Sequence, residues 1–313
     1  MAEVSVIIPN YNHACYLKQR IDTVLKQTYQ DFEIIILDDC SPDNSKEVIE
    51  SCRQHPQITK VIYNTTNSGS TFKQWQKGIQ AATGNYIWIA ESDDWCEPTL
   101  LETLMDGLLA NENVGLAFCQ SCYYYEPNIV KEYTHYPYLA NTEKGSDFIQ
   151  KHMIYGNSVV NASMAVWKKD LYANINPAYT QFKFCGDWLF WISLMQQSDV
   201  FVSGKVLNYF RNHNKDVSSK FYSSGNDFIE NIKVYKLLRE RAVINESQFK
   251  ELIKRQYINF LRVKNSIDSA NLPNIYAAFK KDATLSDYTK IYYALKKQLY
   301  FVKQFLLPNT AAH

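Results

Sequence analysis

Two pairs of adjacent aspartates, Asp38 with Asp39 and Asp93 with Asp94, are the residues of this sequence best suited to chemistry. Each pair comes at the end of an apolar, β-rich run. The second run covers residues 86–90, and Glu91 and Ser92 separate it from its pair. Acids at the carboxyl end of a parallel strand lie in the crevice where open α/β sheets bind ligands. Carboxylate oxygens there suit Mg²⁺ or Mn²⁺, and these ions in turn suit a diphosphate. The pattern therefore predicts an acidic, metal-binding edge of a sheet.

A structural role is the alternative interpretation of the second pair. A solvated loop that begins a helix also contains acids, and Asp94 or Glu97 could serve such a helix near Pro98 because aspartate is a common cap. The repetition of the pattern at two strand ends favours a site, since one pair can contact a base while the other holds a metal.

The elements that must position these acids alternate along the first 125 residues. Strands are expected at 4–8, 32–37, 61–63, 86–90 and 114–119, and helices at 16–25, 45–49, 72–82 and 100–109. This alternation predicts an α/β fold with a mainly parallel, doubly wound sheet flanked by helices. Further along, helices are expected at 146–154 and 187–197, among Tyr- and Asn-rich loops, and the chain after Asn226 is largely helical.

Composition limits the classes of partner. The 313 residues include 33 Lys and Arg against 32 Asp and Glu, so no overall basic charge indicates nucleic acid. Seven scattered cysteines predict no disulfide framework and favour a reduced, cytoplasmic compartment. Cys119 and Cys122 lack a second pair at zinc spacing, so we interpret them as buried structural thiols.

Membrane contact is expected only at the periphery, if at all. The sequence begins without a signal-peptide pattern, and no window approaches the roughly 20 consecutive apolar residues that span a bilayer. Residues 288–307 place apolar side chains on one helical face, beside lysines and tyrosines. Such a helix can lie on the inner face of the cell membrane, or it can pack on its own domain or on a second copy of the chain.

Common glycine motifs for nucleotides are missing. The ten glycines never occur as Gly-x-Gly, and no Gly-Lys-Ser/Thr is present, so neither the dinucleotide fingerprint nor the phosphate loop is found. A nucleotide would have to be bound by other residues.

Four segments resemble the family 2 glycosyltransferases with the GT-A (Rossmann-like) fold. They are Val4-Ser-Val-Ile-Ile-Pro-Asn-Tyr-Asn12, residues 25–39 with Ser41-Pro-Asp-Asn-Ser45, Asn67-Ser-Gly69, and Ser92-Asp-Asp94. They occur in the family's order. Processive members add a Gln-x-x-Arg-Trp signature, and here no Trp follows Arg. The resemblance therefore implies an inverting enzyme that transfers one sugar per encounter.

The resemblance also implies a donor site for a UDP-sugar with Mn²⁺ or Mg²⁺. The residues implied in donor binding are Pro9, Asn10, Tyr11, Asp38, Asp39, Asn67, Asp93 and Arg211. Asp39 matches the acid that contacts the uracil edge, Asp93 matches a ribose contact, and Asp94 matches the metal ligand. Many members carry a further Asp where this sequence has Glu91.

Asp187 matches the catalytic base of the family, within Phe184-Cys-Gly-Asp187-Trp-Leu-Phe-Trp191. A carboxylate there could take the proton of an acceptor hydroxyl as the oxygen attacks the anomeric carbon. The acid that often precedes this base is Gly186 here. The alternative is that Asp187 only caps the helix that follows.

Tyr209-Phe-Arg211-Asn-His213 resembles a late Tyr-Arg-x-His segment of the family. Arg211 could meet the diphosphate and His213 the metal, because guanidinium suits phosphate oxygens and imidazole suits Mn²⁺. A solvated loop is the alternative.

These observations lead us to expect a glycosyltransferase that uses a nucleotide sugar to extend a glycan or lipid-linked acceptor for the cell surface. We expect a GT-A domain over 1–224, with a nucleotide-binding part at about 1–125 and an acceptor part at about 126–224, and a helical C-terminal region over 225–313. A degenerate, non-catalytic nucleotide-binding subunit and a nucleotidyltransferase are the alternatives.

Overall fold

The computed structural model describes residues 2–125, 129–212 and 217–280. The chain divides into two compact units, Met1–Asn214 and Lys215–His313. The expected domain boundary between residues 224 and 225 falls inside the second unit, and the division into domains stays a prediction. The helix expected at 288–307 lies outside the described residues.

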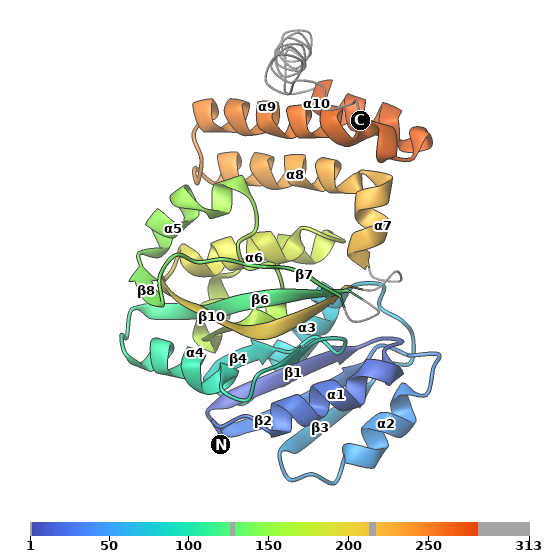
Figure 1. The fold of residues 1–313 in the computed structure, drawn as a ribbon, viewed down its shortest axis with the longest axis vertical. Helices are drawn as coiled ribbons and strands as arrows, with labels where there is room; N and C mark the ends of the chain where they lie inside the picture. Colours follow the sequence, from blue (N-terminus) through green and yellow to red (C-terminus); the bar gives the residue numbers. More distant parts are fainter. Residues whose placement is uncertain (1, 126–128, 213–216, 281–313) are drawn as a thin grey trace, which may run out of the picture. The chain divides into compact units, whose positions relative to one another are not determined.

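A mixed sheet forms the centre of the first unit (Figure 1). Its strands are β1 (Val4–Asn10), β2 (Phe32–Asp38), β3 (Ile58–Tyr63), β4 (Tyr86–Ile89), β5 (Trp95–Cys96), β6 (Val114–Tyr125), β7 (Ile129–Tyr133), β8 (Ala140–Glu143), β9 (Ala165–Lys168) and β10 (Asp199–Asn212). The order is β3-β2-β1-β4-β9-β6-β10-β5, with β7 beside β6 and β8 beside β10. Strands β3, β2, β1 and β4 are parallel, whereas β9 is antiparallel to both of its neighbours.

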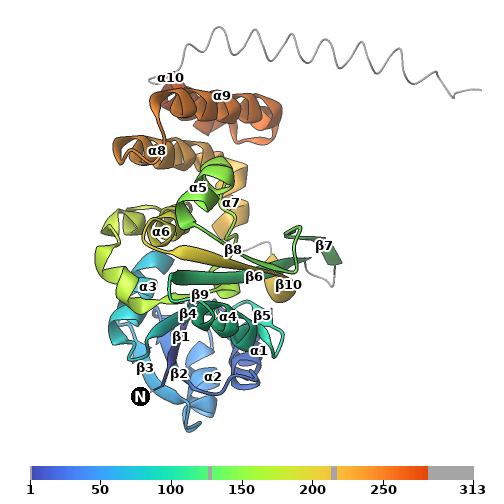
Figure 2. The ribbon, with the colours of Figure 1, turned by 90° about the vertical axis from the view of Figure 1, so that its left-hand side faces the viewer.

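Helices cover both faces of the parallel part of the sheet. The α-helices of this unit are α1 (Ala14–Leu25), α2 (Ser45–Cys52), α3 (Thr71–Ala81), α4 (Leu100–Leu109), α5 (Gly145–Lys151) and α6 (Gly186–Met195). Figure 2 shows α1 and α2 on one side of β1 and β2, with α3 on the other. A Cβ atom at Gly78 of α3 would lie 2.4 Å from Ile7 Cγ2, so the glycine allows α3 to approach β1 closely.

The parallel strands bring the acidic pairs to one edge. Every residue of β1 and β2 is buried, as expected for central strands covered on both faces. Asn10 pairs with Asp38 across β1 and β2, and Ile7 pairs with Ile89 across β1 and β4. The carboxyl ends of β1, β2 and β4 therefore meet, and the residues that follow them share that edge.

The second unit is helical where it is described. It contains α7 (Val217–Ser224), α8 (Asn226–Glu240), α9 (Glu246–Val263) and α10 (Leu272–Lys280). A reciprocal pair of hydrogen bonds between Asn245 and Gln248 forms a capping box at the start of α9. Aromatic side chains of α8, α9 and α10 pack together in its core, namely Phe228, Tyr257, Phe260 and Phe279.

The elements expected in the first 125 residues are confirmed, with boundaries shifted by a few residues. The region after residue 125 was predicted less completely, because β9 and β10 were not expected. Strand β9 has only four residues, and β10 contains Gly204 and several register shifts against β6. Both features obscure the alternating pattern by which strands are found in a sequence.

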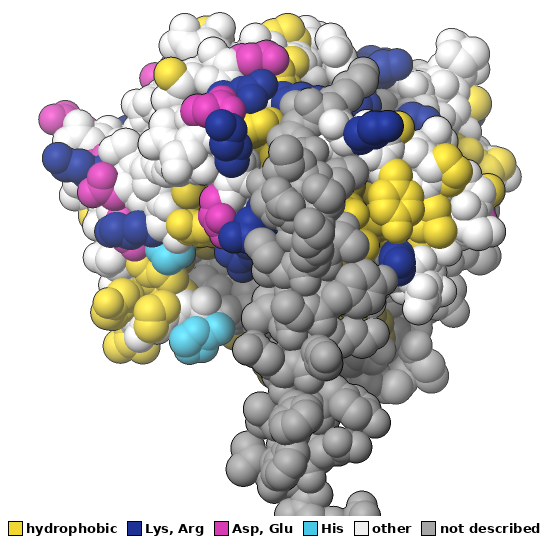
Figure 3. Space-filling view, turned by 90° about the horizontal axis from the view of Figure 1, so that it is seen from above, with side chains coloured by type: hydrophobic (Ala, Val, Ile, Leu, Met, Phe, Trp, Pro, Cys, Tyr) yellow, Lys and Arg dark blue, Asp and Glu magenta, His cyan; other side chains and the backbone are white. Residues whose placement is uncertain are grey.

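The surface reflects the near-balance of charges. Figure 3 shows basic and acidic side chains near one another on one face of the molecule. None of the helices in the described ranges is both long enough and apolar enough to cross a membrane.

Candidate functional site

The first acidic pair holds two loops in place at the carboxyl ends of β1 and β2. Asp38 accepts hydrogen bonds from Asn10 Nδ2 at 2.8 Å and from the Ser41 hydroxyl at 2.6 Å. Ser41 Oγ in turn accepts the backbone N–H of Asn12, which has a positive φ of 57°. Asp38 thereby fixes the loop that carries Tyr11, whose side chain is 46% exposed and open to a ligand.

Asp39 is buried and organises the loop after β3. Its carboxylate accepts from Asn64 Nδ2 at 2.6 Å, from the Ser68 hydroxyl at 2.7 Å and from Gln74 Nε2 at 3.0 Å. Asn67 Nδ2 donates to the Asp39 carbonyl oxygen. A uracil bound by Asp39 would have to share carboxylate oxygens that already accept these hydrogen bonds. The predicted contact between Asp39 and the uracil edge therefore stays a prediction.

In the second acidic pair, Asp93 is partly exposed and Asp94 is enclosed. Asp94 is 1% exposed, and its oxygens accept the Ser163 hydroxyl at 2.6 Å and the Arg211 backbone N–H at 3.1 Å. Asp93 is partly exposed and lies 4.0 Å from His13 Nε2, while His13 Nδ1 lies 2.9 Å from the Ser92 hydroxyl. Asp93 is therefore the more accessible of the two aspartates, whereas Asp94 is enclosed and held in place by its two hydrogen-bond donors.

Three carboxyl groups, those of Glu91, Asp93 and Asp94, are concentrated at this place. Burial raises the pKa of the Asp94 carboxyl well above its ordinary value, and the neighbouring Asp93 raises it further. Burial and the same neighbour raise the pKa of Glu91 to about 8. Both shifts have the cause expected for carboxylates that are close together and removed from water.

Glu91 reaches away from the two aspartates toward α3. Its Oε1 accepts the Trp75 indole N–H at 2.8 Å, and the Trp75 ring packs against Phe190 and Trp191 of α6. A glutamate at this position, where many family members have aspartate, therefore connects the acidic edge to an aromatic cluster under α6.

Arg211 is buried between aromatic rings beside the second acidic pair. Its guanidinium carbon lies 4.4 Å from the ring centre of Tyr16 and 4.5 Å from that of Trp95. Nε donates to the Asp93 carbonyl oxygen at 2.8 Å, and an Nη atom donates to Gln19. These contacts position the turn that carries Asp93 and Asp94, and the expected contact with a diphosphate stays a prediction.

Asp187 lies in the first turn of α6, whose N-cap is Cys185. Asp187 Oδ2 accepts Asn157 Nδ2 at 2.8 Å, and Oδ1 accepts the backbone N–H of Trp188 at 2.8 Å. A Cβ atom at Gly186 would lie 2.4 Å from the Tyr179 carbonyl oxygen and 2.6 Å from the Phe72 ring. Packing against these atoms therefore leaves no room for a side chain at Gly186, and the role of Asp187 as a base stays a prediction.

The remaining predicted site residues have different outcomes. Pro9 is buried in β1 beside Leu37, and Asn67 accepts the Gly69 N–H through Oδ1 in a tight turn with a positive φ at Gly69. His213 lies outside the described residues. Within the described part of the chain, no three His, Cys, Asp or Glu side chains are gathered in an arrangement that could hold a metal.

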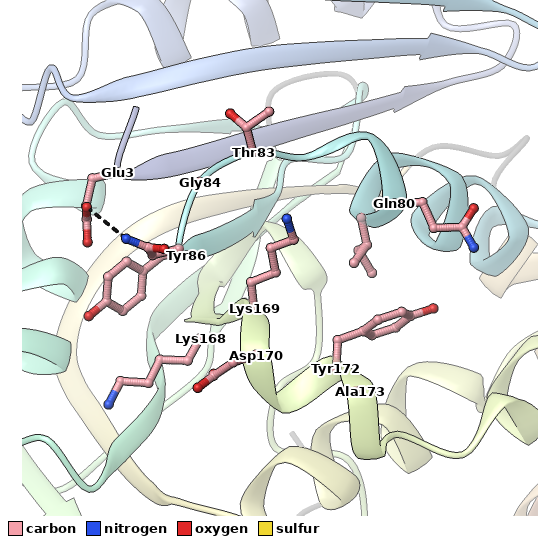
Figure 4. Close-up of a pocket in the computed structure, with 12 residues that line it drawn as sticks. Glu3, Gln80, Thr83, Gly84, Tyr86, Lys168, Lys169, Asp170, Tyr172 and Ala173 are labelled. Carbon is pink, nitrogen blue, oxygen red and sulfur yellow. Dashed lines mark hydrogen bonds between the residues drawn. The ribbon is translucent and has the colours of Figure 1, made fainter. Parts of the chain in front are cut away.

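A hollow of about 680 Å³ lies at the opposite edge, beside the amino ends of β1 and β4 (Figure 4). Glu3 and Tyr86 line it together with Lys168 and Lys169. The two lysine ammonium groups donate to backbone carbonyl oxygens of Glu112 and Ala82. The acids singled out by their spacing are not among its lining residues, so the hollow gives no argument about them.

Several residues that orient the acids were missed from the sequence. They are Ser41, Asn64, Ser68, Trp75, Asn157 and Ser163. Five of the six donate to an acid that lies 16 or more residues away along the chain, and Ser163 follows Asp94 by 69 residues. The exception is Ser41, which donates to Asp38 three residues before it. Two short segments gave a sequence signal because they belonged to a recognised motif, namely Ser41-Pro-Asp-Asn-Ser45 and Asn67-Ser-Gly69.

Comparison with known proteins agrees with this arrangement. The acidic carboxyl edge of a mixed α/β sheet is the architecture of a GT-A fold, and the described helices follow it in the chain. Residues 5–173 match the family described as Glycosyl transferase family 2, which is more than half of the 313 residues. The chain therefore belongs to glycosyl transferase family 2, a family of enzymes that transfer sugars.

Two curated relatives and one solved structure illustrate the likeness. An uncharacterized glycosyltransferase of Haemophilus influenzae is 33% identical over 161 residues, which cover 50% of this chain and 59% of that protein. The GalNAc(5)-diNAcBac-PP-undecaprenol beta-1,3-glucosyltransferase of Campylobacter jejuni is 24% identical over 69% of this chain and 67% of its own length. The match to the Haemophilus protein thus spans less than two thirds of its length.

The crystal structure of S. aureus TarS 1-349 in complex with UDP-GlcNAc has the same fold. The TM-score is 0.69, with 19% sequence identity over 95% of this chain and 92% of the TarS chain. The GT-A fold predicted from the sequence is thereby confirmed, and its sheet contains both parallel and antiparallel strands.

Proposed function

We propose that the chain is a metal-dependent, inverting glycosyltransferase that moves one sugar from a UDP-linked donor to a glycan or lipid-linked acceptor in cell-surface polysaccharide biosynthesis. The observation that carries this proposal is the enclosed carboxylate of Asp94, which Ser163 and Arg211 hold at the carboxyl end of β4. Such a group, with Asp93 beside it, suits a nucleotide diphosphate that is bound through a cation.

The chemistry of the donor set fits Mn²⁺ or Mg²⁺. Carboxylate oxygens are hard ligands, and a bound cation would favour the ionised form of Asp94, whose pKa is raised first by burial and then by the neighbouring Asp93. We assign Asp94 as a ligand, and His213, outside the described residues, as a second one. When bound, the ion would stabilise the charge that develops on the leaving diphosphate.

The protein's own residues supply binding and proton transfer. Pro9 and Asn10 at the end of β1 and Tyr11 directly after it line the nucleotide site, and Asp93 contacts the ribose. Asp187 accepts the proton of the acceptor hydroxyl as that oxygen attacks the anomeric carbon. The bond from that carbon to the diphosphate breaks as the glycosidic bond forms, so a single displacement inverts the centre.

The relatives support the choice of donor and acceptor class. TarS, which has the same fold, binds UDP-GlcNAc, and the name of the Campylobacter relative contains a lipid-linked substrate. We extend both features to this chain as classes only, a UDP-sugar and a lipid-linked or glycan acceptor. A location on the inner face of the cell membrane would bring the site close to such an acceptor.

A thermal-shift panel tests the donor site. UDP, GDP, dTDP and CMP are each added with and without Mn²⁺ to the wild type and to Asp94→Ala. A ligand at a hundredfold excess over its Kd stabilises the native state by about 2.7 kcal/mol. We expect a UDP-selective, Mn²⁺-dependent shift that Asp94→Ala loses.

The matched control for this panel is Asp170→Ala, an exposed aspartate that lines the hollow at the opposite edge. It should retain the wild-type shift. A shift that Asp94→Ala retains would exclude Asp94 as the ligand. The absence of a shift with every nucleotide would contradict the proposed donor site.

A further inference from the structure

Residues 157–163, which we call the bridging segment, connect the two chemical halves of the proposed site. At one end Asn157 Nδ2 donates to Asp187 Oδ2 at 2.8 Å, and at the other end the Ser163 hydroxyl donates to Asp94 Oδ2 at 2.6 Å. Seven residues span at most roughly 25 Å even when fully extended. One short piece of chain therefore contacts both the assigned base and the assigned metal ligand.

The orientation of the Asn157 amide is determined by its second contact. Asn157 Oδ1 accepts the backbone N–H of Val159 at 3.2 Å. Because the amide oxygen is used there, the NH₂ group must be the part that faces Asp187. The side chain therefore donates to the Asp187 carboxylate and restrains the orientation of its Oδ2 atom.

Ser163 has an equally defined environment. It is fully buried, and its hydroxyl accepts the Glu91 backbone N–H at 3.0 Å while it donates to Asp94. The Ser163 N–H donates to Asn161 Oδ1 at 2.7 Å, and its carbonyl oxygen accepts the Trp88 indole N–H at 2.9 Å. These hydrogen bonds define the orientation of the Ser163 hydroxyl, and the hydroxyl in turn restrains the position of Asp94 Oδ2.

The bridging segment is anchored between its ends and next to α6. Val159 is fully buried, and the Trp188 indole N–H donates to the Met153 carbonyl oxygen at 2.8 Å, just before the segment. Trp188 directly follows Asp187, so the chain before the bridging segment is attached to the same turn of α6 that carries the base. The bridging segment is therefore held in one position, from which it can orient the carboxylates of both Asp94 and Asp187.

We propose that Asn157 and Ser163 are positioning residues, Asn157 for the proton-accepting carboxylate of Asp187 and Ser163 for the metal-binding carboxylate of Asp94. The inference rests on the proposed function, because it requires that the two acids have those roles. It predicts that the two residues affect different steps, since each holds a different acid.

Two substitutions separate the contact with Asp187 from the local turn. Asn157→Asp keeps the oxygen that accepts Val159 N–H but replaces the NH₂ group with a second carboxylate oxygen, whereas Asn157→Ala removes both. We measure UDP release from whichever of UDP-glucose, UDP-galactose, UDP-GlcNAc and UDP-GalNAc the wild type uses fastest. Both variants should lose turnover by roughly tenfold to a hundredfold, with unchanged affinity for UDP and Mn²⁺.

A turn-making role alone would leave Asn157→Asp at wild-type turnover, and that result would overturn the assignment of Asn157. Asn176→Asp is the matched control, because Asn176 forms the same kind of turn with the Ala178 N–H but precedes a different helix. It should keep wild-type turnover. A crystal structure of Asn157→Asp gives a readout without turnover, and an unmoved Asp187 carboxylate would also overturn the assignment.

Ser163→Ala tests the other end of the bridging segment by calorimetry. The variant should bind UDP with Mn²⁺ roughly tenfold to a hundredfold more weakly, while UDP binding without metal is unchanged. Wild-type affinity in the presence of Mn²⁺ would overturn the assignment of Ser163.

Two results distinguish an error in the proposed function from an error in the positioning role of Asn157. If Asp187→Asn keeps full turnover, the assigned base is wrong and the proposed function loses its mechanism. If Asp187→Asn is inactive while Asn157→Asp is fully active, the proposed function stands and only the positioning role of Asn157 is excluded.

Discussion

At the scale of single residues, the acids of the site differ in what surrounds them. Asp38, Asp39 and Asp94 are all buried, but Asp38 and Asp39 accept hydrogen bonds that fix loops, whereas Asp94 has a raised pKa and fewer donors. Asp187 lies in the first turn of a helix, where the helix dipole and two hydrogen-bond donors stabilise a carboxylate. We propose this carboxylate as the base, and its two hydrogen bonds restrain the orientation of both of its oxygen atoms.

Asp187→Asn should therefore abolish sugar transfer and leave UDP affinity unchanged. The amide has nearly the same size but cannot accept a proton, so the loss should approach the roughly hundredfold to ten-thousandfold contribution of a general base. Turnover of the preferred UDP-sugar and calorimetry with UDP and Mn²⁺ measure the two quantities. Asp170→Asn is the control, and undiminished transfer by Asp187→Asn would remove the assignment.

The residue types could be predicted from the sequence, but their partners could not. Asp93, Asp94 and Asp187 were recognised because they follow apolar runs or match family motifs. Ser163 and Asn157 belong to no motif, and their roles depend on contacts that form only when distant segments pack. A serine or an asparagine in a loop has too many ordinary functions to be singled out by its type.

At the scale of elements, a buried carboxylate joins the amino ends of the parallel strands. Glu33 at the start of β2 accepts from Ser5 at 2.7 Å, from Thr59 at 2.7 Å, and from the backbone N–H and hydroxyl of Thr83, each at 2.8 Å. These donors come from β1, β3 and the turn before β4. Burial alone would raise the pKa of Glu33, but the hydrogen bonds outweigh it and lower the pKa.

Glu33→Gln should destabilise the protein by about 1–3 kcal/mol at pH 7, because the amide NH₂ would face donors. The lowered folded pKa means that this stabilisation is present above the unfolded pKa and is lost as the pH falls through the folded value. Urea unfolding at pH 7 and pH 4 should show a difference between variant and wild type that shrinks on acidification. Glu112→Gln, at an exposed glutamate, should change stability little at either pH.

A pH-independent difference in stability between Glu33→Gln and wild type would contradict this account of Glu33.

The fold around Glu33 was largely predictable, because buried parallel strands have continuous apolar runs. The antiparallel strands β9 and β10 were not, since β9 is short and β10 is interrupted by bulges. Local pattern therefore specified the first 125 residues better than the later part that carries Asp187.

At the scale of the whole molecule, the two compact units differ in what stabilises them. The first has a sheet with an acidic edge, and the described part of the second is a set of packed helices. Asp227 in the first turn of α8 is 7% exposed, and its Oδ1 has no hydrogen-bond partner among the residues that the structure describes. Burial raises the pKa of Asp227 to about 6.

An aspartate with a raised folded pKa binds its proton more tightly in the folded state. The stability of the second unit should therefore fall as the pH rises from the unfolded value of 3.8 toward 6. Asp227→Asn removes the buried charge and should stabilise this unit by about 1–2 kcal/mol at pH 7, with a smaller effect at pH 4. Glu251→Gln, an exposed change on α9, should have no such effect.

Calorimetric unfolding of Asp227→Asn and wild type, with and without UDP and Mn²⁺, measures whether the effect of this substitution on stability depends on bound nucleotide. A ligand bound by the acidic edge stabilises the first unit, and Asp227→Asn stabilises the second, so the two effects should add if the units are energetically independent. A variant that is no more stable than wild type at pH 7 would show that Asp227 is not a buried, uncompensated charge. A nucleotide shift that disappears in Asp227→Asn would show instead that the helical unit contributes to donor binding.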